Sequence, residues 1–365
     1  MKSLRHILRS PFSSLFFLAG KPRGTVSVFV FVFVFVPQSC VKEELPASNT
    51  PEGNFEALWQ LMDRHYCFFD YKQQAIGVDW DEVHTRYAQK IHPKMSRMQL
   101  FEVLAQMIGE LRDGHVNLGA SFDVGRNWSY YEDYPRNFSA DLIEDYLGTG
   151  SDYKIAAGLE YRILDDHIGY VRCSSFEYSI GDGNIDYLLH AVASCHGLII
   201  DVRDNGGGLL TSSRTFASHF TNEKELVGYI YHKTGPGHND FSSPEPEYVE
   251  PSDGIRWQKP VVVLTNRACY SATNDFVKCM KRFPLVTVLG DSTGGGSGMP
   301  FMQELPNGWS VRYSAVVAID ADCQHTEFGI APDTLVSLDS QDRLRGRDTL
   351  IEAARALITN LEFRI

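Results

Sequence analysis

The sequence predicts an α/β protein, with helices packed against a sheet, from three short apolar runs and the segments around them. The runs are GLIIDVR at 197–203, PVVVLTN at 260–266 and LVTVLG at 285–290. Each has strand length and is rich in β-branched residues, which predicts a buried strand. Helical spacing is found in NIDYLLHAVASC at 184–195 and in SATNDFVKCMKRF at 271–283. Strands that alternate with helices imply layers joined by right-handed crossovers.

The same alternation continues on both sides of this region. EYRILDDHIGYVRCSSF at 160–176 predicts a hairpin, and GWSVRYSAVVAID at 308–320 predicts a further strand. DTLIEAARALITN at 348–360 predicts a last helix, capped by Asp348. We therefore expect residues 159–365 to form one α/β domain.

A small helical bundle is expected before this domain, over residues 52–117. Ser96 precedes RMQLFEVLAQMIGEL and is expected to cap a helix there. Gly114, in RDGH, is expected to supply the left-handed residue that ends it. Residues 118–158 form a linking region, rich in Tyr, Asp, Asn and Gly, to which we assign no structure. The apolar positions at helical spacing include Phe55, Leu58, Trp59, Met62, Tyr66, Val83, Tyr87, Ile91, Leu100, Leu104, Met107, Ile108 and Leu111.

The first 39 residues have the composition of an export signal. They hold five Lys and Arg and no acidic residue, and the twelve uncharged residues TVSVFVFVFVFV lead into PQSC. Such a run is too short to span a bilayer as a helix and suits the apolar part of a secretory signal. A buried strand of alternating Val and Phe is the alternative.

The end of this segment resembles a bacterial lipoprotein signal, although Pro37 stands where such signals usually have Leu. The resemblance implies that residues 1–39 are removed and that Cys40 is acylated. Residues 40–51 would then tether the protein to a membrane of the bacterial cell envelope, and we expect the outer membrane.

Charge and cysteine content exclude several classes of protein. Beyond residue 39 the chain carries 29 basic and 46 acidic side chains, a net charge of −17. Nucleic acid is therefore not an expected partner, because phosphate binding needs a basic face. The six cysteines after Cys40 form no CxxC pair and have no regular spacing, so neither a zinc site nor a disulfide framework is predicted. No cofactor is expected.

Three stretches carry residues that local structure does not require. DVRDNGGG at 201–208 follows a buried strand, and its glycines either allow backbone amides to point into a cleft or make a flexible turn. Ser271 lies where a strand turns into a helix, which suits a helix cap as well as an exposed nucleophile. Glu327 precedes a Pro-Asp turn, where a glutamate is usually only solvated.

The order of these stretches resembles that in the carboxyl-terminal processing (tail-specific) serine proteases. The resemblance covers residues 55–360 and implies a crotonase-like α/β domain of the ClpP/crotonase type, which hydrolyses peptide bonds, often near a free carboxyl terminus. The family's nucleophile corresponds to Ser271, followed here by Ala272 and Thr273. The stretches are DGH at 113–115, DVRDNGGG at 201–208, NRACYSATNDF at 266–276, GDSTGGGSG at 290–298 and EFGIAPD at 327–333.

The general base departs from the family's usual pattern. Many members use a lysine in the glycine-rich loop, where this chain has Gly296. Lys278 is a poor substitute, because it lies roughly 10 Å along the helix from Ser271. The tricorn core protease branch uses a histidine and a glutamate instead, and these match His115 and Glu327.

Resemblance to this branch implies roles for three side chains. Ser271 attacks, His115 accepts its proton and returns it to the leaving amine, and Glu327 orients or charge-stabilises the site. The serine that joins glutamate and histidine in the tricorn site is Gly114 here. A histidine base predicts an acidic limb of the pH profile at roughly 6 to 7.

The oxyanion is expected to be held by the backbone amides of Ala272 and of Gly207 or its neighbour Gly206. Many members also carry a PDZ module, but only about forty residues separate His115 from the catalytic region, which is too few for that domain. The expected partner is a polypeptide substrate. Two rivals remain: a catalytically inactive peptide- or ligand-binding lipoprotein on the same scaffold, suggested by the missing lysine and by Gly114, and a crotonase-like acyl-thioester enzyme.

Overall fold

The computed structural model describes residues 48–362. The predicted export signal and Cys40 lie outside the described residues, as does most of the tether. Residues 48–362 belong to one compact unit. None of the helices in this part of the chain is long and apolar enough to span a membrane.

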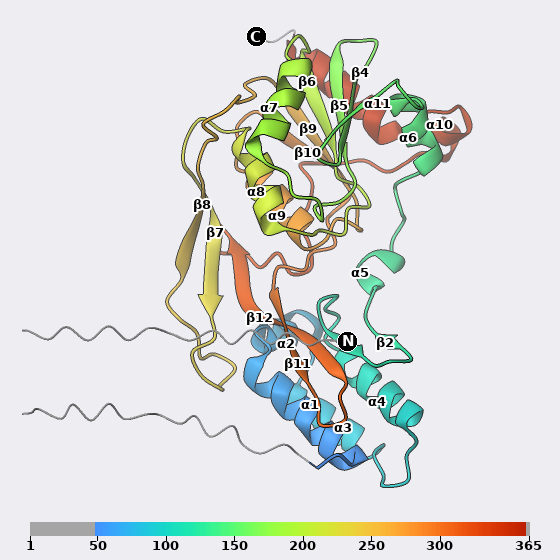
Figure 1. Ribbon diagram of the computed structural model, residues 1–365, viewed down its shortest axis with the longest axis vertical. Coiled ribbons are helices and arrows are strands. Elements are labelled where there is room, and N and C mark those ends of the chain that lie inside the picture. The colour runs from blue at the N-terminus through green and yellow to red at the C-terminus, as the bar shows by residue number, and fades with distance from the viewer. Residues whose placement is uncertain (1–47, 363–365) are drawn as a thin grey trace, which may run out of the picture. The chain divides into compact units, whose positions relative to one another are not determined.

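Helices and strands alternate through most of the described chain (Figure 1). The helices are α1 (Pro51–His65), α2 (Phe69–Ile76), α3 (Trp80–Ala88), α4 (Arg97–Gly109), α5 (Ser129–Glu132), α6 (Ala140–Leu147), α7 (Asp182–Ala191), α8 (Leu210–Ser218), α9 (Ala272–Met280), α10 (Ser340–Leu344) and α11 (Thr349–Glu362). The strands are β1 (Asn117–Gly119), β2 (Val124–Gly125), β3 (Lys154–Ala156), β4 (Leu159–Ile163), β5 (Ile168–Cys173), β6 (Gly197–Asp201), β7 (Glu225–His232), β8 (Glu245–Val249), β9 (Val261–Thr265), β10 (Val286–Gly290), β11 (Met299–Glu304), β12 (Ser310–Asp320) and β13 (Thr334–Leu335).

The larger sheet has seven strands in the order β13-β10-β9-β6-β5-β4-β3. Five of them, from β13 to β5, run parallel, and β4 and β3 extend the sheet in antiparallel pairing. The three apolar runs form β6, β9 and β10, and β4 and β5 form the predicted hairpin. The α/β fold class predicted from the sequence is therefore confirmed.

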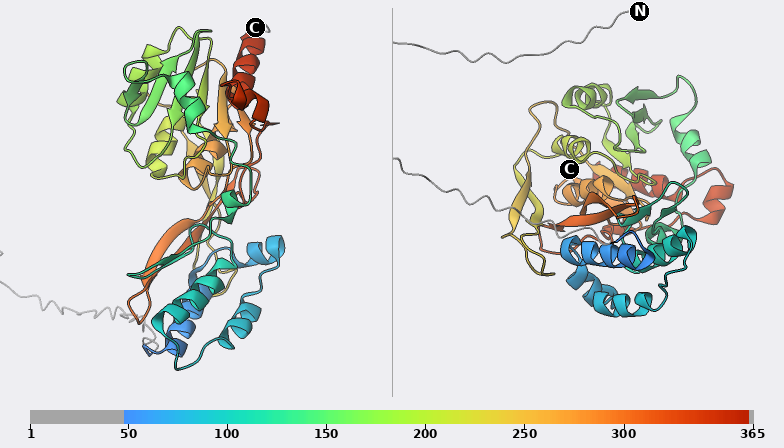
Figure 2. Two further views of the ribbon diagram at one scale, coloured as in Figure 1. Left: turned by 90° about the vertical axis from the view of Figure 1, so that its right-hand side faces the viewer. Right: turned by 60° about the horizontal axis from the view of Figure 1, so that its bottom comes forward.

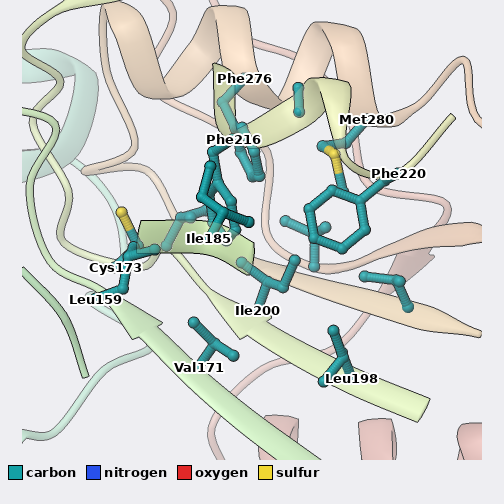
Figure 3. Packing of buried hydrophobic residues seen from close by; sticks show 14 of the residues in the cluster. Leu159, Val171, Cys173, Ile185, Leu198, Ile200, Phe216, Phe220, Phe276 and Met280 are labelled. Carbon is teal, nitrogen blue, oxygen red and sulfur yellow. The ribbon is translucent and has the colours of Figure 1, made fainter. Parts of the chain in front are cut away.

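Helices cover both faces of this sheet. Residues that alternate along one strand belong to different cores: Val263 packs under α7, α8 and α9, whereas Val262 and Leu264 pack under α6 and α11. Figure 3 shows part of the first core, where Phe216, Phe276 and Ile200 lie together. Burial on both faces explains why the strands are continuous apolar runs.

A second sheet joins the helical region to the α/β part. Its strands are ordered β2-β1-β12-β7-β8, and β11 also pairs with β12. Helices α1–α4 lie beside this sheet (Figure 2). They share one hydrophobic core with it, to which Trp309, Val311 and Tyr313 contribute. The predicted N-terminal helical region is present, and the predicted strand at 308–320 belongs to the second sheet.

Two predicted helix caps are confirmed, whereas the predicted end of the helix that follows Ser96 is wrong. Ser96 forms a capping box with Gln99 at the start of α4, and Asp348 accepts hydrogen bonds from the first amides of α11. However, α4 already ends at Gly109, and the left-handed residue beyond it is Arg112, with φ 47°, rather than Gly114. Gly114 is instead needed because a side chain there would clash with the rings of Tyr130 and Tyr270.

Candidate active site

Ser271 occupies the sharp turn between β9 and α9 in a strained backbone conformation. Its φ of 58° and ψ of −120° are unusual for a residue with a side chain and cost about 1–3 kcal/mol. The residue holds the N-cap position of α9, but its side chain makes no capping hydrogen bond. Strand β9 is buried throughout, so the turn fixes the half-buried Ser271 at the carboxyl end of the sheet. Of the two functions suggested by the sequence, the helix cap is therefore not the one its hydroxyl performs.

The hydroxyl of Ser271 meets His115, which comes from the loop between α4 and β1. Ser271 Oγ and His115 Nε2 are 3.0 Å apart, although 156 positions separate the two residues. His115 is 3% exposed and packs edge-on against the Tyr270 ring. Among the described residues, none forms a hydrogen bond with Nδ1 of His115. The structure therefore brings the predicted nucleophile and base into hydrogen-bonding distance.

Burial keeps His115 neutral. It lowers the pKa of the imidazole to about 4, against the opposing effect of the Asp113 carboxylate. The Arg312 guanidinium lowers this pKa further, while the Gly298 carbonyl favours the protonated form. A neutral imidazole has a free lone pair at neutral pH, as a general base requires.

Asp113 is a buried carboxylate that the sequence did not single out. Its oxygens accept hydrogen bonds from the His115 amide at 2.7 Å, the Ser314 hydroxyl at 2.8 Å and the Tyr66 hydroxyl at 3.1 Å. Burial would raise the pKa of Asp113, but the Lys72 ammonium and these donors outweigh it and lower the pKa. Asp113 thus holds the backbone of the turn that carries His115.

Glu327 does not hydrogen-bond to His115 but forms a buried ion pair with Lys72 of α2. Lys72 Nζ lies 3.0 Å from Glu327 Oε1, and neither side chain is more than 1% exposed. The other oxygen, Oε2, accepts from the Ser297 amide at 2.9 Å. Burial and the nearby Asp113 charge raise the pKa of Glu327 to about 7, although Lys72 acts against this. Lys72 therefore links the helical region to the loop around Ser271.

The glycine-rich loop 294–298 packs around Ser271 and Tyr270. The Ser271 amide donates to the Gly295 carbonyl at 2.9 Å, and the Gly296 amide donates to the Glu327 carbonyl at 3.0 Å. Gly296, the position that sequence analysis matched to the family's lysine, has φ 76°, and a Cβ there would lie 2.3 Å from Tyr270 Cζ.

The Tyr270 ring also excludes a side chain at Gly114. A Cβ on Gly114 would come within 2.9 Å of the Tyr270 hydroxyl and 2.8 Å of the Tyr130 ring, and these two rings are stacked. Tyr270 thus occupies the space that a side chain at Gly296 would need and, together with Tyr130, the space that one at Gly114 would need.

The glycine loop 206–208 packs against Ser271. Gly207 has φ 106°, and a Cβ there would lie 2.9 Å from Ser271 Cβ, so only glycine fits against the serine. The Gly207 amide itself donates to Asn205 Oδ1 at 2.9 Å. Within residues 48–362, the amides of Gly206, Gly208 and Ala272 have no acceptor.

Two pockets meet at Ser271. One, of about 420 Å³, is lined by His115, Tyr130 and the glycine loop 206–208. The other, of about 180 Å³, has apolar walls that include Leu210 and Met299. Lys278 lines the smaller pocket and pairs with Asp275 at 3.0 Å and with Glu247 at 3.3 Å. Lys278 therefore makes no hydrogen bond to Ser271, as the sequence analysis expected.

Comparisons with known proteins indicate a family for this chain. Residues 167–336 match peptidase family S41, and residues 47–109 match the tricorn protease C1 domain. A putative peptidase from Parabacteroides merdae of known structure is 53% identical, with a TM-score of 0.81, over 85% of this chain and 97% of that chain. Mature CPAF in complex with lactacystin superposes with a TM-score of 0.66 at 13% identity, over 87% of this chain and all of that one, which shows a shared fold.

Curated relatives are more distant. A carboxyl-terminal-processing protease of Synechocystis is 26% identical over 50% of this chain and 41% of its own length. A putative tricorn-like protease C-terminal subunit of Sulfurisphaera tokodaii is 28% identical over 51% of this chain and 20% of its own length. The chain thus spans less than half the length of these relatives.

The fold is of the α/β class and places a serine at a strained strand-to-helix turn. The chain belongs to peptidase family S41, and the predicted resemblance to carboxyl-terminal processing proteases is confirmed. Of the site residues, sequence analysis missed Lys72, Asp113 and Tyr270. Only Asp113 carried a signal, its place beside His115 in RDGH.

Proposed function

We propose that this chain is a serine peptidase in which Ser271 is the nucleophile and His115 the general base. The proposal rests above all on the 3.0 Å contact between Ser271 Oγ and His115 Nε2. As Oγ bonds to the scissile carbonyl carbon, its proton passes to Nε2. The same proton then goes to the leaving amine as the C–N bond breaks, and water releases the acyl group by the same path.

The backbone amide of Ala272 and an amide of the 206–208 loop hold the oxyanion in this proposal. Ala272 is the first residue of α9, so its N–H has no helical partner and lies at the positive end of the helix. Because the Gly207 amide bonds to Asn205, the amides of Gly206 and Gly208 are the better second donors. Losing such a donor typically costs about 10²–10³-fold in rate.

Glu327 acts on His115 through the backbone in this proposal. It accepts the Ser297 amide at 2.9 Å, and the carbonyl of the next residue, Gly298, is one of the groups that raise the pKa of His115. Lys72 keeps Glu327 in place. Glu327 and Lys72 are therefore positioning residues in this proposal. The sequence suggested that Glu327 orients His115 directly, and this indirect role takes its place.

The experiment that tests the proposal is labelling of the protein by a fluorophosphonate probe. Wild type is expected to be labelled at Ser271, Ser271→Ala is expected not to react, and His115→Ala is expected to react at least about 10²-fold more slowly. Unlabelled wild type, or a Ser271→Ala variant labelled as strongly, would contradict the assignment. An unlabelled protein that still binds peptides would favour the non-catalytic binder instead.

We further propose that the protein is exported and anchored to the outer membrane through acylated Cys40. The support is the basic and apolar segment before PQSC. Mass spectrometry of the mature protein is expected to show a diacylglycerol-modified amino-terminal Cys40, and Cys40→Ser is expected to leave the membrane fraction. Recovery of unmodified Met1 in the membrane fraction would contradict this.

A further inference from the structure

The two pockets beside Ser271 share three lining residues, namely Gly208, Ser271 and Arg312. Gly208 offers a backbone amide and Ser271 the nucleophile, so their place is explained by the reaction. The proposed hydrolysis assigns no role to Arg312. A peptide that enters both pockets must pass this side chain next to the bond that is cut.

Strand β12 directs Arg312 toward the reacting atoms. Its neighbours Val311 and Tyr313 are buried in the core shared with helices α1–α4. Ser314 lies two residues further along the strand and donates to Asp113 at 2.8 Å. Because alternate residues share a face of a strand, Arg312 lies on the face turned to the His115 turn. Its charge accordingly lowers the pKa of His115.

The other charged side chains of the smaller pocket form ion pairs with one another, whereas Arg312 has no carboxylate partner within residues 48–362. Arg214 binds Asp275 at 3.0 Å and Glu247 at 2.7 Å, and Lys278 contacts the same two carboxylates. The Arg312 side chain is exposed, and its guanidinium forms no ion pair or hydrogen bond with any residue of the described chain. In the larger pocket, Glu177 is exposed and is not its partner.

We propose that Arg312 binds a carboxylate of the substrate beside the scissile bond, so that the enzyme selects peptides bearing an acidic group there. This inference rests on the proposed peptidase function. A guanidinium matches a carboxylate with two parallel hydrogen bonds. The chain as a whole has a formal charge of −12 and repels acidic peptides, so their recognition requires a local cation. The carboxylate is either an Asp or Glu side chain or the free carboxyl terminus.

A peptide mixture tests the inference and separates the two sources. Random decapeptides are prepared with free carboxyl termini or as terminal amides, each with Asp and Glu present or replaced by Asn and Gln. Mass spectrometry then counts the cleavages. For one of the two carboxylate sources, wild type is expected to cleave the mixture that contains it about tenfold or more as often as the mixture in which it is neutralised. A wild-type enzyme that cleaves all four mixtures equally would overturn the inference.

Variants assign any preference to Arg312. Arg312→Gln is expected to reduce the preference to less than about twofold, and Arg312→Lys to retain part of it. Arg86→Gln is the matched control, because Arg86 lines neither pocket and pairs with Glu110, so its loss is expected to leave the preference intact. A preference that survives in Arg312→Gln would overturn the assignment.

Failure of the peptidase proposal would look different. If wild type neither reacts with the fluorophosphonate nor cleaves any mixture, catalysis is absent, and binding is measured with the same labelled decapeptides on Ser271→Ala. Tighter binding of the carboxylate-bearing peptides that is lost in Ser271→Ala/Arg312→Gln supports the Arg312 inference on its own. Binding that ignores the carboxylate overturns it.

Discussion

The two halves of the site come from regions that are built in different ways. Ser271 is placed by the parallel sheet, where a buried strand, a strained turn and a helix follow one another along the chain. His115 is placed by contacts between distant segments, because Asp113 holds its turn through Tyr66 of the helical region and Ser314 of β12. The position of the proposed nucleophile thus follows from local chain geometry, whereas that of the proposed base depends on tertiary packing.

The largest effect is expected from removing either reacting group. Ser271→Ala should reduce kcat/KM by at least about 10⁴-fold, and His115→Ala by about 10²–10⁴-fold. The double variant should be hardly slower than Ser271→Ala, because the two side chains act as one unit. Peptide hydrolysis measures these rates, and unchanged near-ultraviolet circular dichroism shows that the fold is intact. Additive losses in the double variant would argue that the two act separately.

The next largest effect is expected at the buried pair that joins the two regions. Lys72→Met leaves Glu327 buried without its cation, so the free energy of unfolding should fall by about 3–5 kcal/mol. Adding Glu327→Gln should recover much of this loss. Lys281→Met is the matched control, because its partly exposed pair with Asp333 should contribute less than about 1 kcal/mol. Urea unfolding measures all three, and equal losses for Lys72→Met and Lys281→Met would contradict the account.

A smaller effect is expected where the Tyr270 ring packs against Gly296. Gly296→Ala forces a Cβ into that ring at a positive φ and should cost about 1–3 kcal/mol of stability. Gly183→Ala provides the opposite case, because it lies within α7 and its Cβ would meet no atom within 4 Å. That change should stabilise the protein by about 0.5–1 kcal/mol. Thermal melting compares the two, and a tolerated Gly296→Ala would remove the steric explanation.

The same contrast explains what sequence analysis recovered. The strands, the main helices and the placement of Ser271 follow from apolar patterns and turn residues that neighbours in the chain determine. Lys72 lies in FDYKQQAI, an ordinary short helix, and its partner is 255 residues away, so no local pattern distinguishes it from a solvated lysine. The missing contact between Glu327 and His115 has the same cause, since Glu327 is engaged by Lys72 and Ser297.

The central claim is that a buried, neutral His115 activates Ser271, and the pH dependence of fluorophosphonate labelling tests it most directly. The rate is measured from pH 8 to 5.5 in wild type and in Glu327→Gln, which removes the titration of Glu327 with its pKa of about 7. Because burial lowers the pKa of His115 to about 4, the base form persists as pH falls, and the rate in Glu327→Gln should change less than about twofold. A roughly tenfold fall by pH 5.5, which an ordinary histidine pKa of about 6.5 produces, would contradict the account.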